Sequence, residues 1–74
     1  MGGEDLFLRS NIQALRIEKG WTQQQLADEL KVSRQTIISI EKNKYMPSLK
    51  LGFRIAEVFD KSIYEVFEYE RQGK

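Results

Sequence analysis

The sequence predicts an all-α domain of five short helices, and it favours a small two-stranded antiparallel sheet formed by the chain ends. Three observations support this. Helix-start signals recur along the 74 residues, and the apolar residues between them follow helical spacing. Apolar stretches near both ends are typical of short strands, the second alternating with acidic residues. A chain of this length holds one domain, so a single core is expected.

Three of the helices are expected to begin with a capping box. In this arrangement a Ser or Thr hydroxyl accepts a hydrogen bond from the third helical amide. A Gln or Glu at that third position reaches back to the amide of the cap residue. The three pairs are Ser10 with Gln13, Thr22 with Gln25, and Ser62 with Glu65.

The other helix boundaries follow from single residues. Gly20 can end the first helix in the left-handed conformation. Ser33 is expected to cap a helix from 34 to about 42. Ser48 is expected to cap one that starts behind Pro47, because proline disfavours helix at the residue before it. The core is expected to come from Ile12, Leu15, Leu26, Ala27, Leu30, Ile37, Ile40, Leu49, Leu51, Ile55, Ala56, Phe59, Ile63, Val66 and Phe67.

These elements divide the chain into three parts. Residues 1–9 are expected to form an N-terminal arm or strand, and residues 69–74 a C-terminal tail. The domain itself spans 10–68. No internal repeat, low-complexity stretch or linker divides it.

The composition excludes several classes of function. Without cysteine there is no disulfide framework and no thiolate metal site. Without histidine the chain lacks the usual general base and the commonest metal ligand. No apolar run is long enough to cross a membrane, and no signal-peptide pattern is present. We therefore expect a cytoplasmic binding module that is not an enzyme and has no metal, cofactor or small-molecule ligand.

The charges are unevenly distributed, although the net charge is only +1. Residues 1–30 carry three cations and five anions, and residues 51–74 carry four cations and five anions. Between them, residues 31–50 carry five cations and one anion. A local basic stretch, rather than the total charge, is typical of phosphate binding. Its cations are Lys31, Arg34, Lys42, Lys44 and Lys50.

The second and third predicted helices are joined only by residues 31–33. Such a short joint makes the two helices cross steeply, as in a helix-turn-helix. Ala27 provides the small side chain that a close crossing needs, while Ile37 and Ile40 face inward. The side chains of the third helix that are left pointing outward are Arg34, Gln35, Ile38, Ser39 and Lys42.

Four runs in this region resemble the Cro/C1-type, or xenobiotic-response-element type, family of phage-repressor-like regulators. They are TQQQLA at 22–27, VSRQTI at 32–37, IEKNKY at 40–45 and PSL at 47–49. The similarity covers about residues 10–68, with the helix-turn-helix at 22–42, and includes very short members such as the cytolysin repressor. It implies a five-helix lambda-repressor-like domain that binds double-stranded DNA, with the helix over 34–42 in the major groove.

The resemblance also implies which side chains of that helix contact bases, and their chemistry agrees. Arg34 and Gln35 lie at its N-terminal end, where Arg matches guanine and Gln matches adenine through paired hydrogen bonds. Ser39 lies one turn beyond Gln35 and can reach the next base or a sugar-phosphate. Ile38 has two interpretations: contact with a thymine methyl group, or packing between this helix and the next.

Other polar residues are expected to hold the DNA backbone. Gln23 opens a helix whose free amides favour anions, although it can also be an ordinary residue of a helix start. Ser33 can serve both as a cap and as a phosphate donor. The loop after the third helix adds four further donors: Lys42, Asn43, Lys44 and Tyr45.

Two features of the scaffold depend on the same resemblance. Arg16 and Glu41 are expected to form a partly buried ion pair between the first helix and the end of the third. Lys31 stands where the family commonly has Gly, because that turn residue often needs a positive φ. This departure puts the crossing angle of the two helices in question.

Large apolar groups remain after the core is filled, and they predict an interface. One copy of so small a domain would bind DNA weakly, whereas a two-fold dimer binds two half-sites about 34 Å apart. We therefore expect a repressor that binds a pseudo-palindromic operator as a homodimer. Phe59 and Phe67 are candidates for either core or interface. The predicted interface residues are Leu6, Phe7, Leu8, Val58, Tyr64, Phe67 and Tyr69.

Two other classes of function are alternatives. An antitoxin-like module that also regulates its own gene usually has an extra segment for its protein partner, and only short segments flank this domain. A toxin-like neighbouring gene would favour that function. An enzyme would need a site built from carboxylates such as Glu65, Glu68 and Glu70, and a solvated acidic face explains these better.

Overall fold

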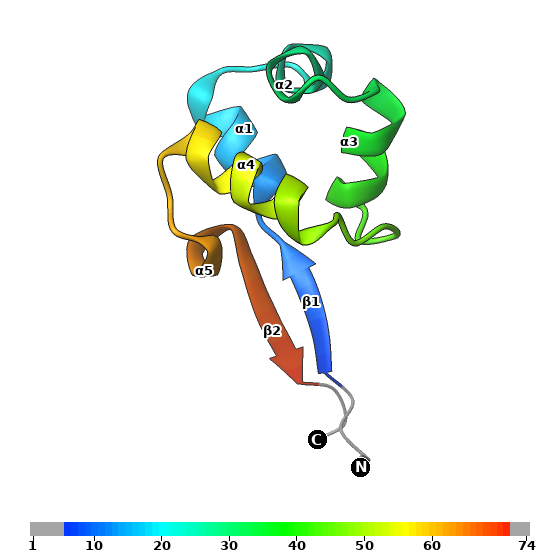
Figure 1. The fold of residues 1–74 in the computed structure, drawn as a ribbon, viewed down its shortest axis with the longest axis vertical. Coiled ribbons are helices and arrows are strands. Elements are labelled where there is room, and N and C mark those ends of the chain that lie inside the picture. The colour runs from blue at the N-terminus through cyan, green and yellow to red at the C-terminus, as the bar shows by residue number, and fades with distance from the viewer. Residues whose placement is uncertain (1–5, 72–74) are drawn as a thin grey trace.

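The computed structural model describes residues 6–71, and the side chains of residues 8–69. Within this part, the five predicted helices and the two-stranded antiparallel sheet are confirmed. Figure 1 shows the helices gathered around one core, with the sheet extending from them toward the two termini. The elements are β1 (Leu6–Ser10), α1 (Ile12–Lys19), α2 (Gln23–Leu30), α3 (Arg34–Glu41), α4 (Leu49–Phe59), α5 (Ile63–Val66) and β2 (Phe67–Arg71).

The sheet joins the two ends of the described chain. β1 and β2 pair antiparallel, with Leu8 opposite Tyr69 and Arg9 opposite Glu68. The guanidinium of Arg9 lies 3.6 Å from the Glu68 carboxylate, and both side chains are half exposed. Successive strand residues face opposite sides, which explains the alternating pattern of the C-terminal stretch.

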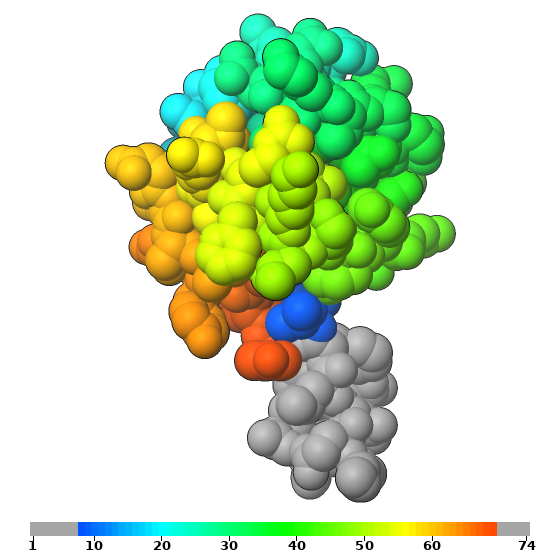
Figure 2. Space-filling model, in the orientation of Figure 1, coloured from blue at the N-terminus to red at the C-terminus, as the bar shows by residue number. Residues whose placement is uncertain are grey.

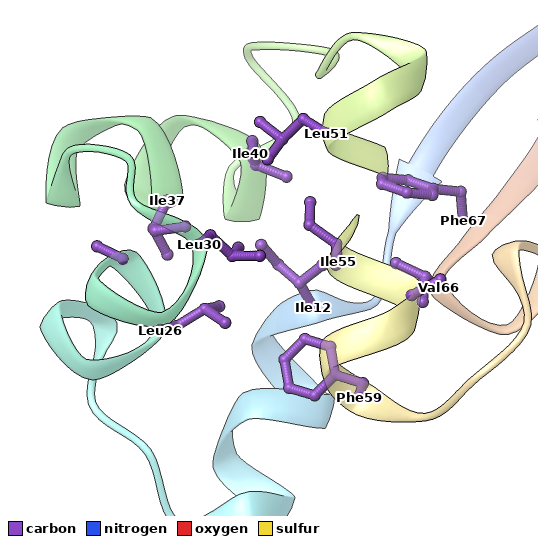
Figure 3. Close-up of a cluster of buried hydrophobic side chains, with 12 residues drawn as sticks. Ile12, Leu26, Leu30, Ile37, Ile40, Leu51, Ile55, Phe59, Val66 and Phe67 are labelled. Carbon is purple, nitrogen blue, oxygen red and sulfur yellow. The ribbon is translucent and has the colours of Figure 1, made fainter. Parts of the chain in front are cut away.

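A single apolar core lies between the helices and the base of the sheet, and all five helices contribute to it (Figure 3). Each fully buried aliphatic side chain stabilises the fold by roughly 1.5–3 kcal/mol relative to an exposed one. Trp21 packs at the edge, with its ring centroid 5.9 Å from that of Phe59. The buried residues are Ile12, Leu26, Ala27, Leu30, Ile37, Ile40, Leu51, Ile55, Ala56, Phe59, Val66 and Phe67.

One prediction for the apolar core is wrong. Leu49, expected in the core, is 74% exposed. The buried face of α4 begins at Leu51, and a residue two positions earlier lies on the opposite side of a helix. Phe67, a candidate for both the core and a dimer interface, is 8% exposed and lies in the core. Its ring packs over Gly52 of α4, where a Cβ on Gly52 would be in ordinary van der Waals contact with Phe67 Cε2, at 3.6 Å.

The predicted starts of the other four helices are confirmed. Thr22 and Ser62 form complete capping boxes, and Ser33 and Ser48 each accept from the third helical amide. In the last box the Ser62 amide donates to the Glu65 carboxylate at 2.7 Å. This hydrogen bond lowers the pKa of Glu65, because it favours the ionised form.

The predicted cap of the first helix is wrong. α1 begins at Ile12, and the residue before it, Asn11, makes no side-chain cap hydrogen bond. Ser10 instead ends β1, and its hydroxyl donates to the carbonyl of Ile40 at 3.1 Å. The local spacing predicted that this hydroxyl would cap α1. It binds instead a carbonyl 30 positions away in the sequence.

Helices α1 to α4 all end in the same backbone arrangement. In each, a left-handed residue and the residue after it donate their amides back to carbonyls of the last turn, as in a Schellman motif. The left-handed residues are Gly20, Lys31, Asn43 and Asp60, with φ of 77°, 59°, 59° and 56°.

Lys31 therefore has a positive φ, the conformation that glycine adopts most readily. The backbone amide of Lys31 donates to the carbonyl of Asp28, and that of Val32 donates to the carbonyl of Ala27. Arg54 of α4 supports the same turn, since its Nη2 donates to the carbonyl of Leu30 at 2.6 Å. The turn thus forms without glycine.

Candidate nucleic-acid interface

Helices α2 and α3 form the predicted helix-turn-helix. Ala27, at the crossing, and Ile37, on the inner face of α3, are both fully buried. Figure 1 shows α3 at the edge of the helical group, so the side of the helix that does not face the core is open. The first turn of α3 is fixed by Ser33, which accepts from the Thr36 amide at 3.1 Å.

The predicted base-contacting residues lie on this open side of α3. Arg34 and Gln35 are exposed at its N-terminal end, and Ser39 is half-buried. Ile38 is also half-buried, so part of its side chain packs and part faces solvent.

A shallow depression of about 240 Å³ brings several of the predicted residues together. Gln35 and Ser39, predicted to contact bases, line it with Ser33 and Tyr45, predicted to contact phosphates. The fifth lining residue is Thr36, which is not among the predicted contact residues. The Ser33 and Thr36 hydroxyls lie 2.9 Å apart and share a hydrogen bond. The sequence signal for this contact is the spacing of three residues between Ser33, the cap residue, and Thr36.

The expected ion pair between Arg16 and Glu41 is present. Arg16 Nε donates to Glu41 Oε2 at 2.6 Å, and the two side chains are 11% and 4% exposed. Arg16 Nη1 also donates to the carbonyl of Trp21 at 2.8 Å. Gln23, expected to hold a phosphate, donates its Nε2 to Glu41 Oε1 at 3.1 Å. One of the two side-chain amide hydrogens of Gln23 is therefore used in this hydrogen bond inside the protein.

The buried position of Glu41 changes the charge of this surface. Glu41 is the one anion among residues 31–50, and its carboxylate is neutralised by Arg16 inside the protein. The cations of the same segment are all exposed. The surface formed by residues 31–50 is therefore more positive than the sequence count alone indicates.

The loop after α3 contains the remaining predicted phosphate contacts. Lys42, Lys44 and Tyr45 are exposed. Asn43 is exposed as well, but its Oδ1 accepts from the backbone amide of Ser10 at 3.0 Å. A carboxamide held through its oxygen keeps its amino group as a donor for phosphate.

The predicted interface residues separate into three groups. Leu8, Tyr64 and Tyr69 are exposed beside an apolar groove of about 380 Å³, lined also by Leu49 and Met46. Figure 2 shows the face on which α4 in yellow, α5 in orange and the coloured strand ends meet.

The other predicted interface residues are less exposed or are not described. Val58 is half-buried against the core, and Phe67 belongs to the core but also lines the groove. The side chains of Leu6 and Phe7 lie outside the part of the chain that the structure describes.

Comparison with known proteins agrees with this geometry. The helix-turn-helix family model matches residues 12–66. The chain belongs to the helix-turn-helix family of transcriptional regulators, of the Cro/C1 type. An uncharacterised regulator of this type from Methanocaldococcus jannaschii is 49% identical over 85% of this chain and 96% of its own length. The regulator YgzD of Bacillus subtilis is 34% identical over 89% of this chain and its full length.

A crystal structure from Bacteroides fragilis, of a protein with a suggested DNA-binding role, has the same fold. It superposes with a TM-score of 0.76 and 26% identity, over 84% of this chain and all of its own. This family of regulators binds DNA and is not an enzyme family. Among residues 6–71, no group of three or more acidic, His or Cys residues could hold a metal ion. In the same part, no helix is long and apolar enough to span a bilayer.

Proposed function

We propose that this helix-turn-helix regulator is a cytoplasmic repressor that binds a pseudo-palindromic operator as a homodimer. In this proposal α3 enters the major groove and the loop over 42–45 holds the backbone of the same half-site. The observation that carries the proposal is the depression beside α3. Its lining includes Gln35 and Ser39, the side chains proposed to contact bases, together with Tyr45 and Ser33, whose phenol and hydroxyl suit phosphate.

The exposed cations support the same arrangement. Lys42 and Lys44 follow α3 directly, so both lie near a backbone that the helix would approach. Neutralising phosphates releases counterions, and this gives affinity without sequence preference. Arg34, exposed at the start of α3, is proposed instead to make a bidentate contact with guanine.

The homodimer is supported by the apolar groove formed by α4, α5 and the sheet. Tyr64 is 78% exposed there, and Leu49 adds a further large apolar side chain to the same face. A contiguous apolar surface of this kind is typical of an interaction site. A two-fold dimer through it would double the specific contacts with DNA.

Two substitutions test the assignment of base and phosphate contacts. Arg34→Ala is expected to cost about 1–3 kcal/mol on the best binding site and to relax the preference at one base position. Lys44→Ala is expected to weaken binding to all sequences similarly and to make the salt dependence shallower. Fluorescence anisotropy on matched specific and scrambled duplexes measures both effects. The assignment fails if the two variants behave alike on both duplexes.

A further inference from the structure

The end of α3 is joined to the sheet through one serine. Ser10, the last residue of β1, donates its backbone amide to Asn43 Oδ1 at 3.0 Å. Its hydroxyl donates to the carbonyl of Ile40 at 3.1 Å. Ile40 lies in the last turn of α3, and Asn43 is the left-handed residue that follows the helix. Both bonds therefore reach the point where the helix ends and the basic loop begins.

Asn43 is held by its backbone and by its side chain. Its amide donates to Ile40 at 3.0 Å, and the amide of Lys44 donates to Ser39 at 2.9 Å. Asparagine adopts the left-handed conformation less readily than glycine does. The hydrogen bond from Ser10 to its side chain adds a tertiary constraint on this residue. The direction in which the loop leaves α3 depends on both sets of bonds.

The next residue extends the connection to the other half of the molecule. The amide of Asn11 donates to Val66 at 2.7 Å, and its Nδ2 donates to the Glu65 carbonyl at 3.1 Å and to Glu68 Oε2 at 2.9 Å. Residues 10 and 11 thus bind the end of α3 on one side and α5 with β2 on the other.

We propose that Ser10 is a positioning residue for DNA binding. Its hydroxyl anchors the last turn of α3 to the sheet, beside the bond from its backbone amide to Asn43, and so holds the loop over 42–45 against the phosphate backbone. This inference rests on the proposed function, in which Lys42, Lys44 and Tyr45 bind phosphates. Ser10 acts through the loop rather than by contact with DNA.

The test uses a labelled duplex of arbitrary sequence about two helical turns long, because phosphate contacts do not depend on sequence. Ser10→Ala removes the hydroxyl donor to Ile40 but keeps the backbone amide donor to Asn43, so it tests the part of the anchor that only the serine side chain supplies. Ser10→Thr keeps both donors. We expect Ser10→Ala to weaken binding about three- to tenfold at low salt, the range one hydrogen bond supplies, and to make the salt dependence shallower. Ser10→Thr is expected to bind as the unmodified protein does.

Amide hydrogen exchange in the DNA-free protein gives a second readout that separates positioning from general stability. The backbone amide of Lys44 donates to the carbonyl of Ser39, so its exchange rate reports whether the hydrogen bonds at the end of α3 are formed. The backbone amide of Leu26, in α2, donates to the carbonyl of the cap residue Thr22 and serves as the control. Ser10→Ala is expected to speed exchange at Lys44 and to leave Leu26 unchanged.

Three results would overturn the proposal, and they differ from one another. Lys44→Ala weakens binding while Ser10→Ala changes neither affinity nor Lys44 exchange: the positioning role is then refuted. Ser10→Ala speeds exchange equally at Lys44 and Leu26: the serine is then only a general stabiliser. Lys44→Ala leaves both affinity and salt dependence unchanged: the loop then does not hold the backbone, and the proposed function fails together with the inference.

Discussion

Glu41 shows how one residue can serve the function from the interior. Its carboxylate accepts from Arg16 and from Gln23, and it is almost completely buried. The pair links α1 to the end of α3, which fixes the helix proposed to enter the major groove. It also removes the one negative charge from the basic segment. A buried pair of this kind is costly to break, because removing one partner leaves a charge without compensation.

Removal of the carboxylate is therefore expected to destabilise the protein. Glu41→Ala should lower the free energy of unfolding by about 3 kcal/mol, since Arg16 then remains buried and unpaired. Glu18→Ala, at an exposed acidic position of α1, should change the same free energy by less than about 0.5 kcal/mol. Urea denaturation monitored by circular dichroism measures both. Equal effects of the two substitutions would contradict a structural role for the pair.

At the scale of helices, starts that depend on residues close in sequence can be predicted, whereas a start changed by a tertiary contact cannot. The boxes at Thr22 and Ser62 were predictable because each involves residues three apart in sequence. Ser10 and Gln13 have the same spacing, but the Ser10 hydroxyl donates instead to the carbonyl of Ile40 in α3. The left-handed conformations of Asn43 and Asp60 were not predicted, because the chain has no glycine there to indicate them.

The candidate site follows the same division. The open side of α3 could be predicted from helical periodicity once Ile37 and Ile40 were placed in the core. The contact between Gln23 and Glu41 could not, because it joins two helices 18 positions apart in sequence. The packing of the Phe67 ring over Gly52 could not be predicted for a similar reason, since the two residues come together only in the folded chain.

The turn between α2 and α3 gives a prediction for an element. Lys31 has φ of 59°, a conformation that costs a non-glycine residue roughly 1–2 kcal/mol. Lys31→Gly removes this strain, against the greater freedom of glycine in the unfolded chain, so we expect a net gain of about 0.5–1 kcal/mol. Lys31→Ala keeps the strain and should show no such gain. Thermal unfolding of both variants measures the difference, and a Gly variant less stable than the Ala variant would contradict the argument.

At the scale of the whole molecule, most of the large apolar side chains that are exposed in the described part of the chain line the groove of the proposed dimer face. Tyr64→Glu is expected to abolish the dimer at micromolar concentration without unfolding the domain, because it places a charge in a desolvated contact. Ile17→Glu is the matched control, since Ile17 is also an exposed large apolar residue but does not line the groove. Size-exclusion chromatography with light scattering measures the mass. A single-chain mass for the unmodified protein would contradict the dimer.

Selection of bound sites from random duplex DNA tests the central claim most directly, because it requires α3, the loop and the dimer together. The account predicts that enriched sequences contain two inverted half-sites whose centres lie about 34 Å, one helical turn, apart. In the Arg34→Ala variant, one base position of each half-site should lose its preference. Failure to enrich any sequence, or enrichment of sites without two-fold symmetry, would contradict the account.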